Sequence, residues 1–245
     1  MEDQYSVFIN AGAVVLLSST LLEQEKHDVL NSVLFAQLVA NKKFPTSVPA
    51  GKWYETYLGV LKDTWLQRAV AWESFALGSE SKCTMVDWVE QRLEEPLGHT
   101  MAARVECVLN NIAQLPCTHP AIELLREQTF RPKNVDASEA TEAVYSNVRL
   151  EIIVVQQGPL MNSLLVEFET TAQILTHLFG HIFSCDDVVG NIKLRWFQAS
   201  LSNALYAPVR DAVVTKLADK AAKNILDISD TQRGEAGDLS SDSNI

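Results

Sequence analysis

The sequence predicts an α+β fold: a helical layer from the first half of the chain, an antiparallel β-sheet from the second half, and a C-terminal helix. Apolar residues before position 130 recur mainly at spacings of three and four, which mark one face of a helix. Beyond position 138 the period shortens towards two and β-branched residues become frequent, as in strands. Neither half alone has both a hydrophobic sheet face and an element to cover it. We therefore expect one domain.

This domain is predicted to span residues 1–228, with a helical part at 1–130 and the sheet and final helix at 138–228. A polar connection at residues 131–138 joins the two parts. Residues 229–245 combine low hydrophobicity with net negative charge, so we expect a disordered acidic tail.

The first helix is predicted from a capping box, Thr20-Leu21-Leu22-Glu23, to Lys42-Lys43. Lysines in the last turn suit the negative end of the helix dipole, and Pro45 prevents continuation. The rest of this half is predicted to contain a helix at 51–67 and a short strand at 69–75. A third helix is predicted from a cap at Thr84 to about Glu94, where Pro96 stops it. Two more helices are predicted at 99–114 and 119–128, the second with Pro120 in its first turn.

Three strands are predicted in the second half. Val148–Val155 is nearly continuous and apolar, as in a buried strand, while residues 164–169 and 192–197 alternate. If these last two are antiparallel neighbours, opposite charges face each other across them and stabilise the pair. We expect these charges, Glu167, Glu169, Lys193 and Arg195, to form a ladder on a solvated face of the sheet, with the other face covered by helices.

A last helix is predicted from Pro208, with an apolar stripe formed by Val209, Ala212, Val213, Leu217 and Ala221. The stripe is expected to pack on the sheet. The alternative is a helix that docks on a partner.

The formal charge of −11 argues against a nucleic-acid partner, because such binding depends on neutralising phosphates, and it disfavours docking on anionic lipid. The four cysteines form no Cys-x-x-Cys pair and are expected to be free thiols. No positively charged leader opens the sequence, and the apolar run Val7–Leu17 is about half the length that a membrane-spanning helix needs. We expect a soluble cytoplasmic protein, although export by a specialised route would leave no readable signal.

The stretch THLFGHIFSCDD, residues 176–187, holds the strongest candidates for chemistry. His177 and His181 have the spacing of a zinc-protease helix, but Leu178 stands where that motif needs a catalytic glutamate. In a helix His177 and Cys185 would lie two turns apart, too far to share one metal. A thiol nucleophile at Cys185 would need a base, and adjacent carboxylates disfavour the thiolate. We therefore predict an ordinary corner of the core, with Asp186 or Asp187 bonded to its own backbone, and neither a metal nor a cofactor.

Aromatic side chains cluster between residues 53 and 88, and core packing between helices explains them most simply. The alternative is an exposed aromatic patch for a protein partner or a membrane interface, formed by Trp53, Tyr57, Trp65, Trp72 and Trp88.

Phosphate-binding and hydrolase motifs are absent, so an enzyme is disfavoured. The leading hypothesis is a non-enzymatic interaction or assembly protein that binds a protein partner or itself. The second is a toxin-like or effector protein that acts on membranes through aromatic-rich helices or the apolar strands 148–155 and 164–168, released from the core on contact with lipid. The third is a thiol- or metal-dependent hydrolase centred on Cys185, His177 and His181.

Overall fold

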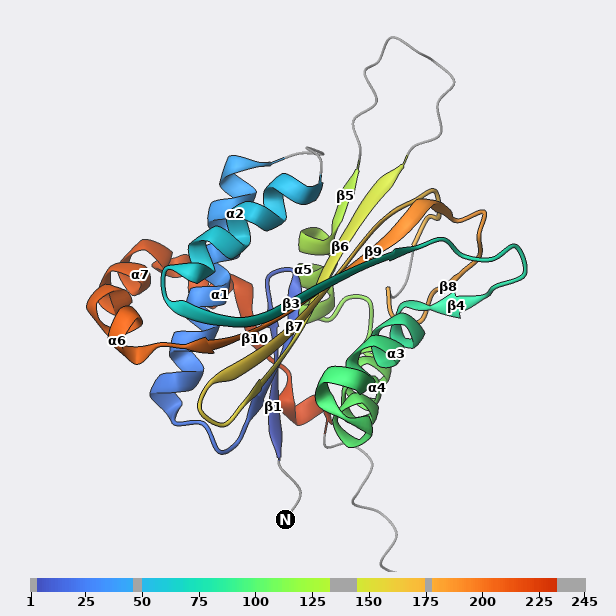
Figure 1. The fold of residues 1–245 in the computed structure, drawn as a ribbon. Helices are drawn as coiled ribbons and strands as arrows, with labels where there is room; N and C mark the ends of the chain where they lie inside the picture. The colour runs from blue at the N-terminus through green and yellow to red at the C-terminus, as the bar shows by residue number, and fades with distance from the viewer. Residues whose placement is uncertain (1–3, 46–49, 133–144, 175–177, 233–245) are drawn as a thin grey trace, which may run out of the picture.

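The computed structural model describes residues 4–45, 50–132, 145–174 and 178–232. Within these residues eight strands form one sheet in the order β10-β1-β2-β6-β7-β9-β3, with β5 also paired to β6 (Figure 1). Two short strands, β4 (Cys83–Thr84) and β8 (Ile182–Phe183), pair separately. The strands of the main sheet are β1 (Tyr5–Asn10), β2 (Ala13–Ser18), β3 (Trp65–Phe75), β5 (Phe130–Pro132), β6 (Ser146–Gln156), β7 (Leu160–Thr170), β9 (Val188–Leu201) and β10 (Ile225–Asp227).

The N-terminal apolar run forms the β1–β2 hairpin, so the sheet does not come from the second half alone as expected. Its turn passes through Ala11, whose φ of 50° is left-handed, and the buried Asn10 amide donates to the carbonyl of Leu30. Strand β2 pairs in parallel with β6, with Ala13 opposite Glu151, whereas the other pairs of the sheet are antiparallel. The predicted strand at 148–155 is confirmed as β6, and the predicted antiparallel neighbours are confirmed as β7 and β9.

Helices cover both faces of the sheet, which corrects the expectation of one covered and one solvated face (Figure 1). On one face lie α1 (Glu23–Lys43) and α2 (Ala50–Lys62). On the other lie α3 (Met85–Leu97), α4 (His99–Gln114) and α5 (Pro120–Thr129). Alternate residues of each central strand therefore enter two different hydrophobic cores.

Local sequence patterns correctly predicted the start of some of these elements and mispredicted others. The Thr84 hydroxyl accepts from the amide of Asp87 and caps α3, and Pro120 opens α5, as predicted. Helix α1 instead begins at Glu23, because the Glu25 carboxylate accepts from the amide of Leu22, so the predicted Thr20 cap is wrong. Helix α2 ends at Lys62, and Trp65 starts strand β3, which contains the predicted strand 69–75.

The C-terminal helical region is interrupted at Ala218, whose φ is 44°. It consists of α6 (Asn203–Tyr206), a 3-10 turn (Ala207–Val209), α7 (Arg210–Leu217) and α8 (Asp219–Asn224). Val213 and Leu217 pack with Leu34 of α1, so the stripe lies on a helix and not on the sheet. Of the predicted tail, Ser229–Gln232 form a 3-10 turn, and residues 233–245 lie outside the described residues. Over the described ranges, no helix combines the length and apolar character needed to cross a membrane.

Candidate functional site

The three central strands β6, β7 and β9 have two chemically different faces. The side chains that point towards α3, α4 and α5 form an apolar face: Val148, Leu150, Ile152, Val154, Leu164, Val166, Phe168, Ile192, Leu194 and Trp196. The alternate side chains point towards α1 and α2. Several of these carry charge, and four of them, Arg149, Glu151, Glu167 and Arg195, form what we call the charged face.

Glu167 is the centre of the charged face and is only 1% exposed. Its Oε1 accepts from Arg149 Nε at 2.8 Å, and its Oε2 lies 3.5 Å from Arg195 Nε, an ion-pair contact too long for a good hydrogen bond. A buried carboxylate is tolerated only when such partners compensate its lost hydration. The predicted solvated ladder is therefore wrong for Glu167, which is buried between sheet and helix, whereas β7 and β9 do pair as expected and Lys193 is exposed.

Helix α2 closes the charged face with aromatic rings. The Arg149 guanidinium lies 4.2 Å from the Trp53 ring centroid, and the Arg195 guanidinium lies 5.0 Å from that of Tyr54. Each contact is a cation–π interaction that uses the ring face and leaves the arginine free to pair with Glu167. The aromatic side chains of α2 thus pack on the arginines of the charged face.

Glu151 is the second buried carboxylate of the charged face. The Tyr57 hydroxyl donates to its Oε1 at 2.9 Å, and the Ser163 hydroxyl donates to the same oxygen. Burial raises the pKa of Glu151 to about 7, although both hydrogen bonds oppose the shift. Burial also raises the pKa of Tyr57, helped by the negative charge of Glu151. One hydrogen bond between α2 and the sheet, from Tyr57 to Glu151, therefore involves a carboxyl group whose pKa is near neutrality.

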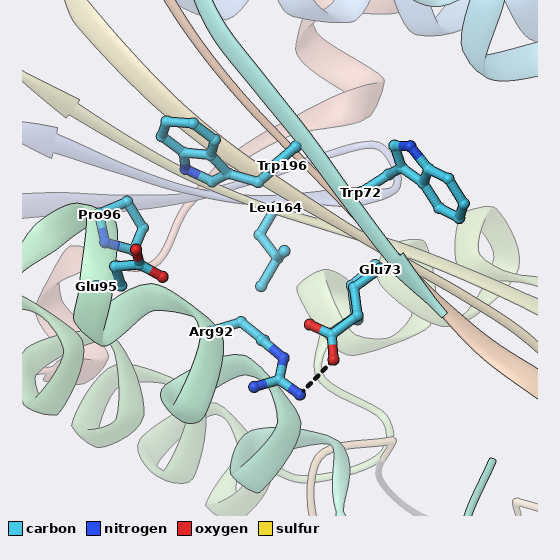
Figure 2. A pocket seen from close by; sticks show the side chains of 9 residues that line it. Trp72, Glu73, Arg92, Glu95, Pro96, Leu164 and Trp196 are labelled. Atoms are coloured by element: carbon cyan, nitrogen blue, oxygen red, sulfur yellow. Dashed lines mark hydrogen bonds and ion pairs between the residues drawn. The ribbon is translucent and has the colours of Figure 1, made fainter. Parts of the chain in front are cut away.

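Helix α3 fits the opposite, apolar face less closely. A cavity of about 390 Å³ separates it from the sheet at the edge strand β3 (Figure 2). Leu164, Leu194 and Trp196 of the apolar face line it. Its other lining residues are Ala71, Trp72 and Glu73 from β3 and Arg92, Glu95 and Pro96 from α3. Arg92 Nη2 donates to Glu73 Oε1 at 2.7 Å and bridges the rim.

The histidine and cysteine candidates do not form a described catalytic or metal centre. His177 lies outside the described residues, and His181 packs its ring on Phe183. The Cys185 thiol donates to the carbonyl of Ser79 at 3.6 Å and lies 3.7 Å from Asp186 Oδ1. Within the described ranges no three metal-ligating side chains come together.

The predicted turn after this segment is confirmed. The Asp187 carboxylate accepts from the amide and the hydroxyl of Ser184. These hydrogen bonds lower the pKa of Asp187, which fits a structural cap. The described part of residues 176–187 is a corner that closes the apolar core through Phe179 and Phe183.

The five aromatic candidates do not share a surface, which corrects the patch hypothesis. Trp53, Tyr57, Trp65 and Trp88 are buried, and they belong to two different cores, whereas Trp72 is 81% exposed. The sequence reasoning also missed Glu151 as a candidate. The available signal was a carboxylate inside the apolar run of β6, where an ionisable group has to find a buried partner.

No family model matches this chain, and no curated protein matches it. Among solved structures, a delta-endotoxin is 13% identical over 79% of this chain and 82% of its own, with a TM-score of 0.44. The activated Cyt2Ba monomer from Bacillus thuringiensis subsp. israelensis is 11% identical over 78% and 98%, with a TM-score of 0.43. The Evf virulence factor is 8% identical over 90% and 85%, with a TM-score of 0.31. Likenesses this distant assign neither a family nor an activity.

Proposed function

We propose that this protein acts on membranes, as a toxin-like or effector protein, by presenting the apolar face of β6, β7 and β9 to lipid. One observation carries the proposal: these strands are apolar along one face, carry buried and half-buried charges among apolar side chains on the other, and are covered by helices on both faces. Strands that work at a membrane need an apolar side for lipid and a polar side for water.

The strand lengths support this function. β6 and β7 have 11 residues each and β9 has 14. About 9–11 residues are enough for a strand to cross the hydrocarbon core of a bilayer. Every backbone group in lipid also needs a partner, and β7 is already paired along its length on both sides.

The layer that would have to move is the α3–α4 hairpin. Because the cavity separates α3 from Leu164, Leu194 and Trp196, part of the apolar face lacks the close packing found in protein interiors. Because α3 does not pack closely on these side chains in the structure, moving the hairpin away breaks fewer contacts between α3 and the sheet. Lipid would then replace α3 on this face.

The charged face, on the opposite side of the sheet, also supports the proposal. A charged network is costly to bury and gains hydration when α2 separates, so water can replace part of what the helix provides. The formal charge of −11 predicts better action on zwitterionic than on anionic vesicles, because anionic lipid repels the protein.

Dye release from phosphatidylcholine vesicles tests the proposal. In a background without the natural cysteines, Glu73→Cys and Arg92→Cys joined by a short, reductant-cleavable bridge would tie α3 to β3, since the native side chains meet at 2.7 Å. We expect release from the unbridged protein, strong inhibition by the bridge and recovery after reduction.

The matched control keeps Cys107 as its one natural cysteine and bridges it to Asn111→Cys on the same helix, α4, where the native side chains are in contact. It should leave release unchanged. The proposal fails if no vesicle composition or pH gives release, or if the α3 bridge has no more effect than the α4 bridge.

Protein association is a second candidate, favoured by a different observation. Strand β3 ends the sheet, and Val70 and Trp72 on it are 56% and 81% exposed. Long, apolar edge strands are sites of pairing with other chains. The hydrolase hypothesis has no comparable support, since Cys185 lies beside a carboxylate.

A further inference from the structure

We infer that the free edge of β3 and the cavity under α3 form one docking site for an extended peptide segment that places a large apolar side chain in the cavity. The inference is independent of membrane action and gives the association hypothesis a specific partner chemistry. It rests on the edge, the cavity and the charges around them.

The edge supplies main-chain hydrogen bonding. β3 has 11 residues, pairs with β9 on one side and has no strand on its other side among the described residues. Residues 70–74 are all exposed. The opposite edge of the sheet ends in β10, with only three residues, the usual way in which proteins limit edge pairing. The two edges are therefore not equivalent, and β3 is the one open to an added strand.

The cavity lies where a side chain of that added strand would point. Ala71 and Glu73 pair with Trp196 and Leu194, so these four side chains share the face that looks towards α3. Cross-strand partners in an antiparallel pair lie on the same face. A residue added directly opposite Ala71 would thus place its side chain at the cavity. The volume of about 390 Å³ is ample for a large side chain.

The lining favours an apolar occupant and disfavours an acidic one. Leu164, Leu194 and Trp196 form the floor, while Glu73 and Glu95 outnumber Arg92, so an acidic side chain would be repelled. The buried Trp196 Nε1–H has no hydrogen-bond acceptor among the described residues. A peptide carbonyl could satisfy it, and buried donors normally have such a partner.

The other face of β3 extends the site. Trp72 pairs with Arg195 and borders the cavity, but its ring lies on the far side of β3 from Leu164 and Trp196 (Figure 2). Exposed Val70 and Trp72 can cover the alternate side chains of the added strand. β-branched residues in those positions pair well with an aromatic ring across strands.

A second copy of this chain is a poorer occupant. Antiparallel pairing of two β3 strands about a two-fold axis at Ala71 places Ala69, Ala71 and Glu73 of each copy on the cavity side. Neither alanine fills the cavity, and Glu73 adds a negative charge next to Glu95. A partner segment with a leucine-sized or aromatic residue fits better.

The probe is a blocked nine-residue peptide of alternating threonine and valine, with leucine at its centre and lysine at each end. Binding is measured by titration calorimetry, with dye release followed separately. We expect saturable binding that Ala71→Trp, which fills the cavity from an exposed position, weakens about tenfold or more. Ala76→Trp, also exposed but beyond the strand, should leave binding within about twofold.

Two control peptides complete the test. One has aspartate at the centre, and the other has methylated amides along the pairing edge; both should bind at least about tenfold more weakly. Absence of binding by the leucine peptide overturns the inference, as does equal binding of the aspartate peptide. A dimer in sedimentation that Ala71→Trp abolishes would also overturn it, because the occupant would then be a second copy. Thermal unfolding of each variant establishes that it is folded.

Discussion

The two faces of β6, β7 and β9 are held to their helical layers by different forces. The face under α3–α5 is apolar, and its attachment depends on buried area, yet it contains the cavity of about 390 Å³. The face under α2 also packs in an apolar core, but it contains in addition two buried carboxylates and two arginines that make directed contacts with aromatic side chains. Apolar packing weakens gradually when contacts are lost, whereas a buried charge network fails when one partner is removed.

The largest effect is expected from Glu167→Ala. This change leaves Arg149 and Arg195 without their shared carboxylate beneath α2, which should destabilise the fold by about 3–5 kcal/mol in urea unfolding. The double change Arg149→Met with Glu167→Leu should recover most of this loss, because it removes the two most buried charges and leaves only Arg195, whose side chain is 26% exposed. Equal destabilisation by the single and double changes would mean that the face is held by packing alone.

On the apolar face, Leu150→Ala should cost about 4 kcal/mol and Leu164→Ala about 2–3 kcal/mol, measured in the same way. Both leucines are buried, at 0% and 1% exposure, but only Leu164 lines the existing cavity and so has fewer contacts to lose. The same cost at both positions would contradict the loose fit of α3.

Glu151→Gln tests the charged face by pH. The folded pKa of about 7 lies above the ordinary value of 4.5, so protonated Glu151 favours the fold. That contribution is complete below about pH 4.5 and is lost as the pH rises through 7, a change of about 3 kcal/mol. Relative to wild type, Glu151→Gln should therefore gain about 3 kcal/mol between pH 4.5 and pH 8. The matched control is Glu55→Gln on the exposed side of α2, and a pH-independent difference for Glu151→Gln would refute the assignment.

The smallest effect is expected from Trp72→Ser. With 81% of its surface exposed, this side chain should change the free energy of unfolding by less than about 0.5 kcal/mol. The same change should weaken peptide binding at β3, whereas the buried Trp65 cannot be replaced without loss of stability. A large loss of stability from Trp72→Ser would show that Trp72 packs in the fold and is not displayed.

Short-range sequence patterns correctly predicted features that depend on residues close together in the chain. The Thr84 cap, Pro120 at the start of α5 and the strand at Val148–Val155 follow from short-range patterns, and the structure contains them. The pairing of β7 with β9 followed from alternation and complementary charge. These features depend on neighbours along one or two segments.

What the sequence could not predict depends on tertiary context. Glu167 alternates as a solvated residue would, and only the position of α2 above it makes it a buried ion pair. The exposure of Trp72 and the burial of Trp65 differ because Trp65 packs in the core under α1 and α2, whereas Trp72 lies further along the edge strand, outside that core. The candidate site was therefore found from the structure: Glu167 and Arg195 had been assigned to a ladder and Trp53 and Tyr57 to a patch, but Arg149 and Glu151 had not been singled out.

The position of the N-terminal hairpin has a consequence for synthesis. β2 pairs with β6, and β1 pairs with β10, so both neighbours of the hairpin leave the ribosome long after it does. Distant pairings of this kind slow folding, because a long chain must be ordered before they form. All six residues of β2 are buried in the finished sheet, so a nascent chain carries an apolar segment without its partners. Such a segment is a target for chaperones until β6 has been synthesised and can pair with it.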